Sequence, residues 1–290
     1  MTPAPDRTAH EAQLLARFDA LHTARSGSTI AARLYAQALG EEHPGQVAAF
    51  SSCDWALLGL LVARLRLRPR QVLVDAGCGT GGIGLWLARA LDTDLVGLDL
   101  SPVAVREATA RIPHFGLAPT RAAFRATSLE ATGLLAGHAH GVVCVDALGF
   151  AADPVAALRE LARILAPGGR LALTRATRRA AEPGWAAEAA EAGLVLEHVD
   201  ERPGEPVMWD RLYGLWSDHA AELRRELGQD QAVRMLAEAR RRRPSLPGRR
   251  AVLLTLRRPP AGAGPGAVPA TMSGRAPGRT GPDTPERNPQ

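Results

Sequence analysis

The sequence contains no lysine, and Asn288 is its single asparagine. All 35 basic residues are therefore arginines, and they exceed the 30 acidic residues to give a formal net charge of +5. An arginine-only set of cations in a chain rich in alanine and glycine is typical of a GC-rich coding sequence. The positive charge alone therefore does not predict a nucleic-acid partner.

Aromatic residues make up only 4% of the chain, and no apolar run is long enough to cross a bilayer. The three cysteines, Cys53, Cys78 and Cys144, form no C-x-x-C motif, so neither a disulfide framework nor a zinc site is predicted. The polar stretch from Met1 to Glu11 does not resemble a signal peptide. With 46% hydrophobic residues available for a core, we expect a cytoplasmic globular protein that does not enter a membrane.

The chain divides into three parts. Residues 1–68 predict an N-terminal helical cap, because apolar residues such as Leu14, Phe18 and Leu21 recur at helical spacing. Residues 69–258 predict the main domain. Residues 259–290 are rich in proline and glycine and almost free of large apolar groups, so we expect this tail to be disordered.

In the main domain, short β-branched runs alternate with amphipathic helices, which predicts right-handed βαβ units. The expected fold is α/β, a doubly wound and mostly parallel seven-stranded sheet with helices on both faces. The expected strands are 71–75, 94–99, 121–126, 141–146, 170–175, 194–201 and 250–256. Helices are expected from about Gly81, Pro102 and Asp153, over 183–192, and in an insert over 207–243 between the last two strands.

Two features of the insert region leave alternatives open. Trp209, Tyr213 and Trp216 concentrate aromatic rings in a chain that has few, either to pack the insert onto the fold or to line a substrate pocket. The arginine cluster of 240–243 with 249–250 follows a predicted helix. It is either a solvated face that favours the helix dipole or an anion-binding surface.

The central motif is a buried strand that runs into the glycine-rich turn of residues 76–82, AGCGTGG, at the start of a helix. Glycines there let the backbone pass close to a ligand. Gly77, Gly79 and Gly82 also satisfy the G-x-G-x-x-G dinucleotide fingerprint, with Asp99 at the end of the next strand. Asp75 is expected to face the cavity, where its charge would repel a pyrophosphate and attract a cationic cofactor.

This stretch resembles the class I S-adenosylmethionine-dependent methyltransferases, whose first motif, D-x-G-x-G-x-G, is matched by Asp75, Gly77, Gly79 and Gly81. Asp99 matches the acid that ends the family's second strand and holds both ribose hydroxyls. Residues 142–148 resemble the fourth strand, and the LAPGGRL sequence at 165–171 resembles the turn into the fifth. The resemblance implies a Rossmann-like methyltransferase fold and S-adenosylmethionine as cofactor. It implies the following cofactor-binding residues: Asp75, Gly77, Cys78, Gly79, Thr80, Gly81, Asp99, Leu100, Ser128, Leu129 and Val145.

One position departs from the family pattern. After the third strand the family often has an acid that contacts the adenine amino group, whereas this chain has Thr127-Ser128-Leu129. Because the Ser128 hydroxyl and the Leu129 backbone can still form hydrogen bonds, we expect altered adenine recognition.

Methyl transfer from a sulfonium mainly requires alignment and exclusion of water, so a catalytic side chain is optional. We identify His219, on the insert, and Asp146, at the end of the fourth strand, as catalytic candidates. A surface histidine and a backbone-bonded carboxylate are the alternatives. His10, His22, His140 and His198 are expected away from the site, and no cluster of acids and amides after the fourth strand indicates a metal. The expected substrate or lid residues are Tyr35, Ser51, Trp55, Trp209, Tyr213 and Trp216.

The resemblance therefore implies a bacterial methyltransferase acting on a small molecule, as in natural-product biosynthesis. Three alternatives stay open: a protein of this fold that binds S-adenosylmethionine but catalyses a rearrangement or cyclisation, a nucleic-acid methyltransferase, and an NAD-dependent dehydrogenase. The sequence also leaves open whether the protein is a monomer or a homodimer.

Overall fold

The computed structural model describes residues 7–260, with side chains from residue 11 onward. The expectation of a disordered tail over 259–290 therefore falls, from residue 261 on, outside the described residues. Residues 7–260 belong to one compact unit, and the boundary between cap and main domain at residue 68 stays a prediction. Within residues 7–260, none of the helices has the length and apolar character needed to span a membrane.

The core of the protein is a seven-stranded sheet in the order β3-β2-β1-β4-β5-β7-β6. Strands β1 to β5 run parallel, and β7 pairs antiparallel with both β5 and β6. This confirms the mostly parallel, seven-stranded sheet. The strands are β1 (Val72–Ala76), β2 (Asp94–Asp99), β3 (Ala122–Ala126), β4 (Ala139–Cys144), β5 (Leu165–Arg178), β6 (Val195–Glu201) and β7 (Arg249–Arg257).

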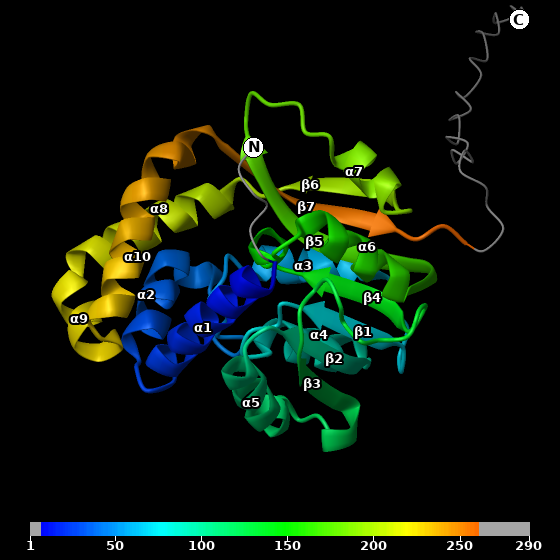
Figure 1. Cartoon of the computed structure of the whole chain (residues 1–290), viewed down its shortest axis with the longest axis horizontal. Helices are drawn as coiled ribbons and strands as arrows, with labels where there is room; N and C mark the ends of the chain where they lie inside the picture. The colour runs from blue at the N-terminus through cyan, green and yellow to red at the C-terminus, as the bar shows by residue number, and fades with distance from the viewer. Residues whose placement is uncertain (1–6, 261–290) are drawn as a thin grey trace, which may run out of the picture. The chain divides into compact units, whose positions relative to one another are not determined.

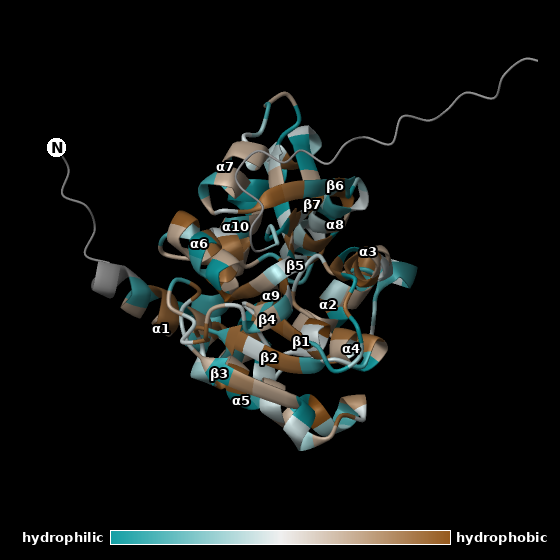
Figure 2. Cartoon of the chain, turned by 90° about the vertical axis from the view of Figure 1, so that its right-hand side faces the viewer, coloured by the Kyte–Doolittle hydropathy of each residue, from teal (hydrophilic) through white to brown (hydrophobic). Residues whose placement is uncertain are grey.

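Helices cover both faces of the sheet, and Figure 2 shows the central strands β1, β2 and β4 as mainly hydrophobic ribbons between them. Leu73 of β1 packs in the apolar cluster of one face, and Val74 packs in the cluster of the other. This alternation is what a strand buried on both sides requires. The helices of the first face are α3 (Trp55–Leu65), α4 (Gly82–Leu91) and α5 (Pro102–Arg111), and those of the second are α6 (Pro154–Ile164) and α7 (Trp185–Glu191).

Side-chain caps fix where several helices begin. The Ser101 hydroxyl accepts a hydrogen bond from the Ala104 N–H at 3.2 Å, as the Ser-Pro pair predicts. Asp153 accepts bonds from the N–H groups of Val155 and Ala156, both at 3.0 Å. Ser101 lies two residues beyond the end of β2, so α5 starts at the carboxyl edge of the sheet, whereas α6 starts after a longer turn that follows β4.

A helical lobe lies beside the sheet (Figure 1). Apolar residues of α2, such as Ile30 and Leu34, share one buried cluster with Leu212 and Trp216 of α8, and the insert begins at Gly204 rather than near residue 207. Segments from both ends of the described chain thus build one lobe. Its helices are α1 (Arg7–Ser26), α2 (Ile30–Leu39), α8 (Gly204–Asp218), α9 (Ala220–Leu227) and α10 (Gln229–Arg242).

Candidate active site

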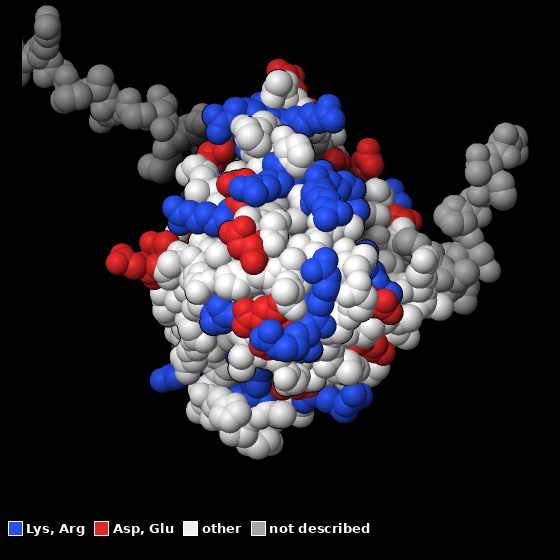
Figure 3. Space-filling model, turned by 90° about the vertical axis from the view of Figure 1, so that its left-hand side faces the viewer, with Lys and Arg blue, Asp and Glu red and all other residues white. Residues whose placement is uncertain are grey.

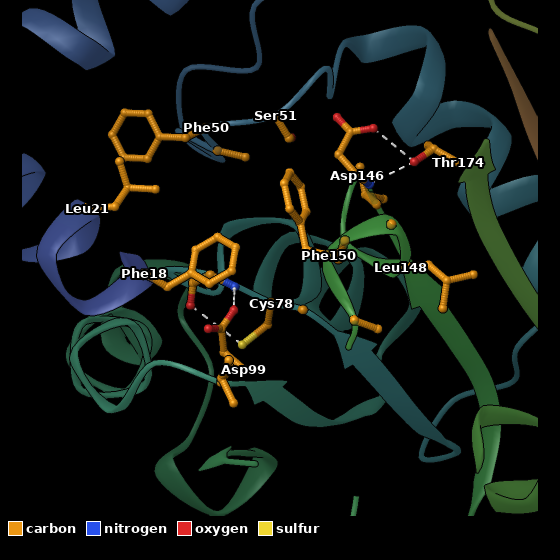
Figure 4. A pocket seen from close by; sticks show the side chains of 18 of the residues that line it. Phe18, Leu21, Phe50, Ser51, Cys78, Asp99, Asp146, Leu148, Phe150 and Thr174 are labelled. Carbon is orange, nitrogen blue, oxygen red and sulfur yellow. Dashed lines mark hydrogen bonds between the residues drawn. The ribbon is translucent and has the colours of Figure 1, made fainter. Parts of the chain in front are cut away.

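A cavity of 820 Å³ lies at the carboxyl edge of the parallel strands. It is lined by the glycine turn after β1 and by the segments that follow β2, β3 and β4, and residues of α1, α8 and α10 complete its wall. In an open parallel α/β sheet this edge is where ligands bind, and the volume is that of a small-molecule site. Figure 4 shows Cys78 and Asp99 at one part of the cavity and Asp146 and Thr174 at another.

The glycine turn brings bare backbone to the cavity. Gly77 has φ +77°, and a Cβ there would lie 2.2 Å from the Cβ of Ala147, so only glycine fits. The N–H groups of Gly77 and Cys78 donate to the Leu98 carbonyl at 2.8 and 2.9 Å, which ties the turn to the end of β2. Gly77, Cys78, Gly79 and Thr80 all line the cavity, as expected from the motif.

Asp99 is held in place at the end of β2 and faces the cavity. Its Oδ2 accepts a bond from the Gly79 N–H at 2.8 Å, and its Oδ1 accepts one from the Ser101 N–H at 2.9 Å. Each carboxylate oxygen keeps a further lone pair for a ligand, so the group can accept two hydrogen bonds from neighbouring hydroxyls. Leu100, Ser128, Leu129 and Val145 also line the cavity, as the resemblance implied.

The structure corrects the expected positions of Asp75 and Gly81, neither of which lines the cavity. Because side chains alternate along a strand, Asp75 points to the same face as Leu73, beneath α4. It is 2% exposed, accepts a bond from the Gly84 N–H at 2.9 Å, and burial raises its pKa to about 7. Contrary to expectation, Asp75 therefore does not face the cavity and does not repel a pyrophosphate from it.

Helix α1 covers the cavity, whereas the sequence predicted a helical cap without showing what it covers. Phe18, Leu21, His22 and Arg25 lie on its inner face and line the cavity. The Phe18 ring meets the Phe150 ring edge to face at 5.6 Å, so a helix from the start of the chain touches the turn after β4 (Figure 4). The only sequence signal for this was the apolar spacing of α1, which does not say what that face covers.

His22 was expected to lie away from the site, and the structure corrects this. It is 7% exposed, and a Cβ built on Gly79 would lie 3.9 Å from its Cε1. Burial lowers the pKa of His22, an effect that the charge of Asp99 opposes and that of Arg25 reinforces. Its Nδ1 has no hydrogen-bond partner among the residues that the structure describes.

Asp146 lines the cavity just beyond β4, which ends at Cys144 and not at residue 146 as expected. It has φ +52°, an unusual backbone conformation for a residue other than glycine. Its carboxylate accepts bonds from the Ser52 N–H at 2.7 Å and the Thr174 hydroxyl at 2.9 Å. Asp146 therefore ties the segment before α3 to β5.

His219, the other catalytic candidate, does not line the cavity. It lies at the junction of α8 and α9, where its Nδ1 is 3.0 Å from the Glu222 Oε2. The insert covers the cavity with an earlier turn of α8, so the histidine at the end of that helix points elsewhere. The expectation that His219 lies in the active site was therefore wrong.

Aromatic rings form a continuous wall on the side of the helical lobe. Successive rings of Phe50, Tyr35, Trp209, Tyr213 and Trp216 lie with centroids 5.3 to 6.3 Å apart, and all five line the cavity. These distances suit edge-to-face and offset-stacked contacts. Ser51 lines the cavity beside this wall.

Trp55 is the exception among the expected lid residues. It is 44% exposed, packs against Trp86 at 6.0 Å, and does not line the cavity. It is the first residue of α3, whose buried face is formed by Leu57, Leu58 and Leu61. The expectation of a lid role for Trp55 was therefore wrong.

The arginine cluster is largely neutralised. Arg249 binds Glu205 through two nitrogens at 2.7 and 2.9 Å, Arg243 binds Asp210 at 2.8 Å, and Arg250 binds Glu201 at 2.6 Å. Figure 3 shows positive and negative side chains next to one another on the side of the molecule where α8 to α10 lie. These pairs favour the structural interpretation of the cluster, although Arg242 and Arg249 also line the cavity.

Comparison with known proteins finds similarity over the residues that build much of this site. Residues 74–173 match a family model described as "Methyltransferase domain". A curated relative, the ubiquinone biosynthesis O-methyltransferase of Xanthomonas oryzae pv. oryzae, is 34% identical over 122 residues, which are 42% of this chain and 49% of the relative. The chain spans about half the length of the first curated relatives it matches.

Solved structures share the fold at low sequence identity. The [4+2]-cyclase SpnF matches with a TM-score of 0.68 at 19% identity over 88% of this chain and 97% of that chain. A methyltransferase from Geobacter sulfurreducens, solved with S-adenosyl-L-homocysteine, matches with a TM-score of 0.56 at 19% identity over 77% and 97% of the two chains. These likenesses confirm the Rossmann-like methyltransferase fold.

Proposed function

We infer that this protein, whose residues 74–173 match the methyltransferase-domain model, is an enzyme that transfers the methyl group of S-adenosylmethionine to a small organic molecule. One observation carries the inference. The Asp99 carboxylate, held by the Gly79 and Ser101 N–H groups, faces the cavity beside a glycine turn that leaves room for a ligand. A carboxylate placed this way suits the vicinal diol of a ribose.

The residues around the cavity fit the parts of the cofactor. Asp99 would hold the ribose, and the exposed backbone of Gly77 to Thr80 would lie along the amino-acid portion. Ser128 and Leu129 would contact the adenine, with Glu130 beside them as an additional acceptor. Glu130 would take the place of the acid that the family often has after the third strand, although its Oε1 already accepts a bond from the Asp153 N–H at 2.9 Å.

Cofactor binding would supply a methyl group that is already activated for displacement, so the chain's own residues need to orient the acceptor and exclude water. The contact between Phe18 and Phe150 closes the cavity on the side of α1. Asp146 positions the segment that contains Ser51 and offers a carboxylate to an acceptor hydroxyl. Burial lowers the pKa of His22, which favours its uncharged form, and that form can accept a proton or a hydrogen bond.

Two finer parts of the proposal concern the kind of acceptor. The aromatic wall and the size of the cavity favour a natural-product intermediate over a very small acceptor. The charge pairs of Arg243, Arg249 and Arg250 disfavour a nucleic-acid substrate, which would need free cations along one face. Salt-sensitive retention on RNA would reverse this view. The cytoplasmic location and a homodimer stay predictions.

Isothermal titration with S-adenosylmethionine, S-adenosylhomocysteine and NAD tests the cofactor. We expect the two adenosyl ligands to bind the wild type, and Asp99→Ala to weaken both by roughly tenfold or more, since a charge-assisted bond is lost. Glu191→Ala, an exposed acid on α7, is the matched control and should bind as the wild type does. Preference for NAD, or equal binding by Asp99→Ala, would overturn the proposal.

A second candidate is a reaction on the bound acceptor without methyl transfer, such as cyclisation. The placement of His219 outside the cavity favours keeping it, because His22 is then the single histidine among the described residues that lines the cavity and could serve as a base. Incubation with labelled S-adenosylmethionine and candidate acceptors separates the two reactions. Methyl transfer forms one S-adenosylhomocysteine per product, whereas a cyclisation forms product with the cofactor unchanged.

A further inference from the structure

Arg25 is a cation of the cavity wall without a carboxylate partner. It reaches the cavity from the last turns of α1, and no acidic group of the described residues lies within ion-pair distance of it. Its Nε has no hydrogen-bond partner, and its guanidinium stacks 4.2 Å from the centroid of the Phe50 ring. By contrast, Arg249 is fully engaged by Glu205.

The groups that face Arg25 do not neutralise it. Burial lowers the pKa of Arg25, and the Tyr35 hydroxyl and the Glu238 carboxylate only partly oppose this shift. Glu238 is itself shared, since its Oε1 lies 3.4 Å from Arg242 and 3.5 Å from the Tyr213 hydroxyl. A half-buried cation without a counterion is unfavourable, and an anion entering the cavity would relieve that cost.

The surroundings of Arg25 indicate what carries the anion. The guanidinium stands at the beginning of the aromatic wall, because Phe50 contacts Tyr35 at 5.6 Å and Tyr35 contacts Trp209 at 6.3 Å. At the other end of this wall the buried Trp216 Nε1 also lacks a hydrogen-bond partner. The wall thus pairs a cation and an unused donor with flat apolar surface.

We propose that Arg25 binds an anionic group, carboxylate or phosphate, of the methyl acceptor, whose planar or apolar body lies along the aromatic wall. The acceptor is then a small organic acid. This inference rests on the proposed function and names the substrate class of that site. The carboxylate of the cofactor is a second anionic group that Arg25 could bind. The acceptor is favoured because Arg25 contacts Phe50, whereas His22, one turn earlier, is the α1 residue that lies against Gly79.

The first arm of the test measures acceptor binding without turnover. Quenching of tryptophan fluorescence is titrated in saturating S-adenosylhomocysteine with 4-hydroxybenzoate, 4-coumarate and 3-(4-hydroxyphenyl)propanoate, each beside its primary amide. We expect the wild type to bind at least one acid about tenfold or more tightly than its amide, and Arg25→Gln to lose that preference. Arg224→Gln, which removes an exposed charge from α9, should keep it. The proposal is overturned if no acid binds better than its amide, or if Arg25→Gln keeps the preference.

The second arm identifies the source of the anion. Affinities for S-adenosylhomocysteine and for 5′-methylthioadenosine, which lacks the carboxylate, are compared in wild type and Arg25→Gln. We expect both to change less than twofold in the variant. A loss confined to S-adenosylhomocysteine would assign Arg25 to the cofactor and overturn the proposal. If the wild type bound no S-adenosylhomocysteine at all, the proposed function itself would have failed, which this readout distinguishes.

Discussion

The two regions that meet at the cavity are built in different ways. The sheet edge contributes mainly backbone and a few short-range hydrogen bonds, such as those from Gly79 and Ser101 to Asp99. The helical lobe contributes side chains from segments far apart in the sequence, such as Tyr35 and Trp209, whose rings lie 6.3 Å apart. The sheet edge therefore depends on local conformation, whereas the lobe depends on long-range packing.

Gly77→Val should have the largest effect, because it attacks the local conformation of the sheet edge. The Cβ of the added side chain would lie 2.2 Å from the Cβ of Ala147. Position 77 also has φ +77°, which a β-branched residue does not tolerate. We expect a loss of roughly 3 kcal/mol or more in unfolding free energy and no measurable cofactor binding. Urea denaturation and titration calorimetry check both.

The control for this variant is Gly59→Ala. Gly59 lies in α3, away from the cavity, with no atom within 4 Å of an added Cβ. Alanine favours a helix over glycine by about 0.5–1 kcal/mol, so this variant should be slightly more stable than the wild type. A Gly77→Val protein with normal cofactor affinity would show that the turn does not approach the ligand.

Asp75→Asn should change how stability depends on pH. Burial raises the pKa of Asp75 to about 7 in the folded protein, above its usual value of 3.8 when unfolded. The folded state therefore favours the protonated form, and the wild type should lose on the order of a few kcal/mol of stability as pH rises from about 4 to about 7. Asparagine cannot ionise and can still accept the bond from the Gly84 N–H.

The measurement is urea denaturation of both proteins at pH 5 and pH 8. The stability of Asp75→Asn relative to the wild type should increase between these values. Its cofactor affinity at pH 5 should stay within about threefold of the wild type, because Asp75 does not line the cavity. A pH-independent difference between the two proteins would mean that Asp75 stays ionised when folded.

Trp209→Ala and Trp55→Ala compare a tryptophan of the aromatic wall with one outside the cavity. Trp209 stacks on Tyr213 at 5.6 Å and lines the cavity, so its loss should raise the KM for the acceptor about tenfold while leaving cofactor affinity unchanged. Trp55→Ala should have the smallest effect, with a KM for the acceptor within twofold of the wild-type value. If both substitutions changed the KM for the acceptor equally in steady-state kinetics, this would contradict the placement of Trp209 in the cavity wall and Trp55 outside it.

The residues at the sheet edge could be predicted from the sequence better than those of the lobe, for a physical reason. Gly77, Gly79 and Asp99 follow directly from strands, so a local pattern places them at the same edge. Asp75 was misplaced because successive side chains of a strand point to opposite faces of the sheet, and its side chain lies on the face covered by α4. The fold itself was predictable because alternating strands and helices admit few topologies.

The lobe could not be assembled from local patterns. The spacing of Leu14, Phe18 and Leu21 predicts an apolar helix face, but whether it covers a core or a cavity depends on where α1 packs. His22 and Arg25 therefore stayed unrecognised, and His219 was favoured because the insert as a whole was expected over the site. Only the three-dimensional arrangement shows that α8 faces the cavity with Trp209 and Tyr213 instead.

The apolar cluster of the helical lobe has an evolutionary consequence. It joins α2 to α8, with Leu34 from one segment and Leu212 from the other, and neither segment interrupts β1 to β5. Descendants of a common ancestor could therefore diverge in the acceptors they use by altering these two segments, with the glycine turn untouched. Because each segment buries its apolar face against the other, the two would have to diverge together.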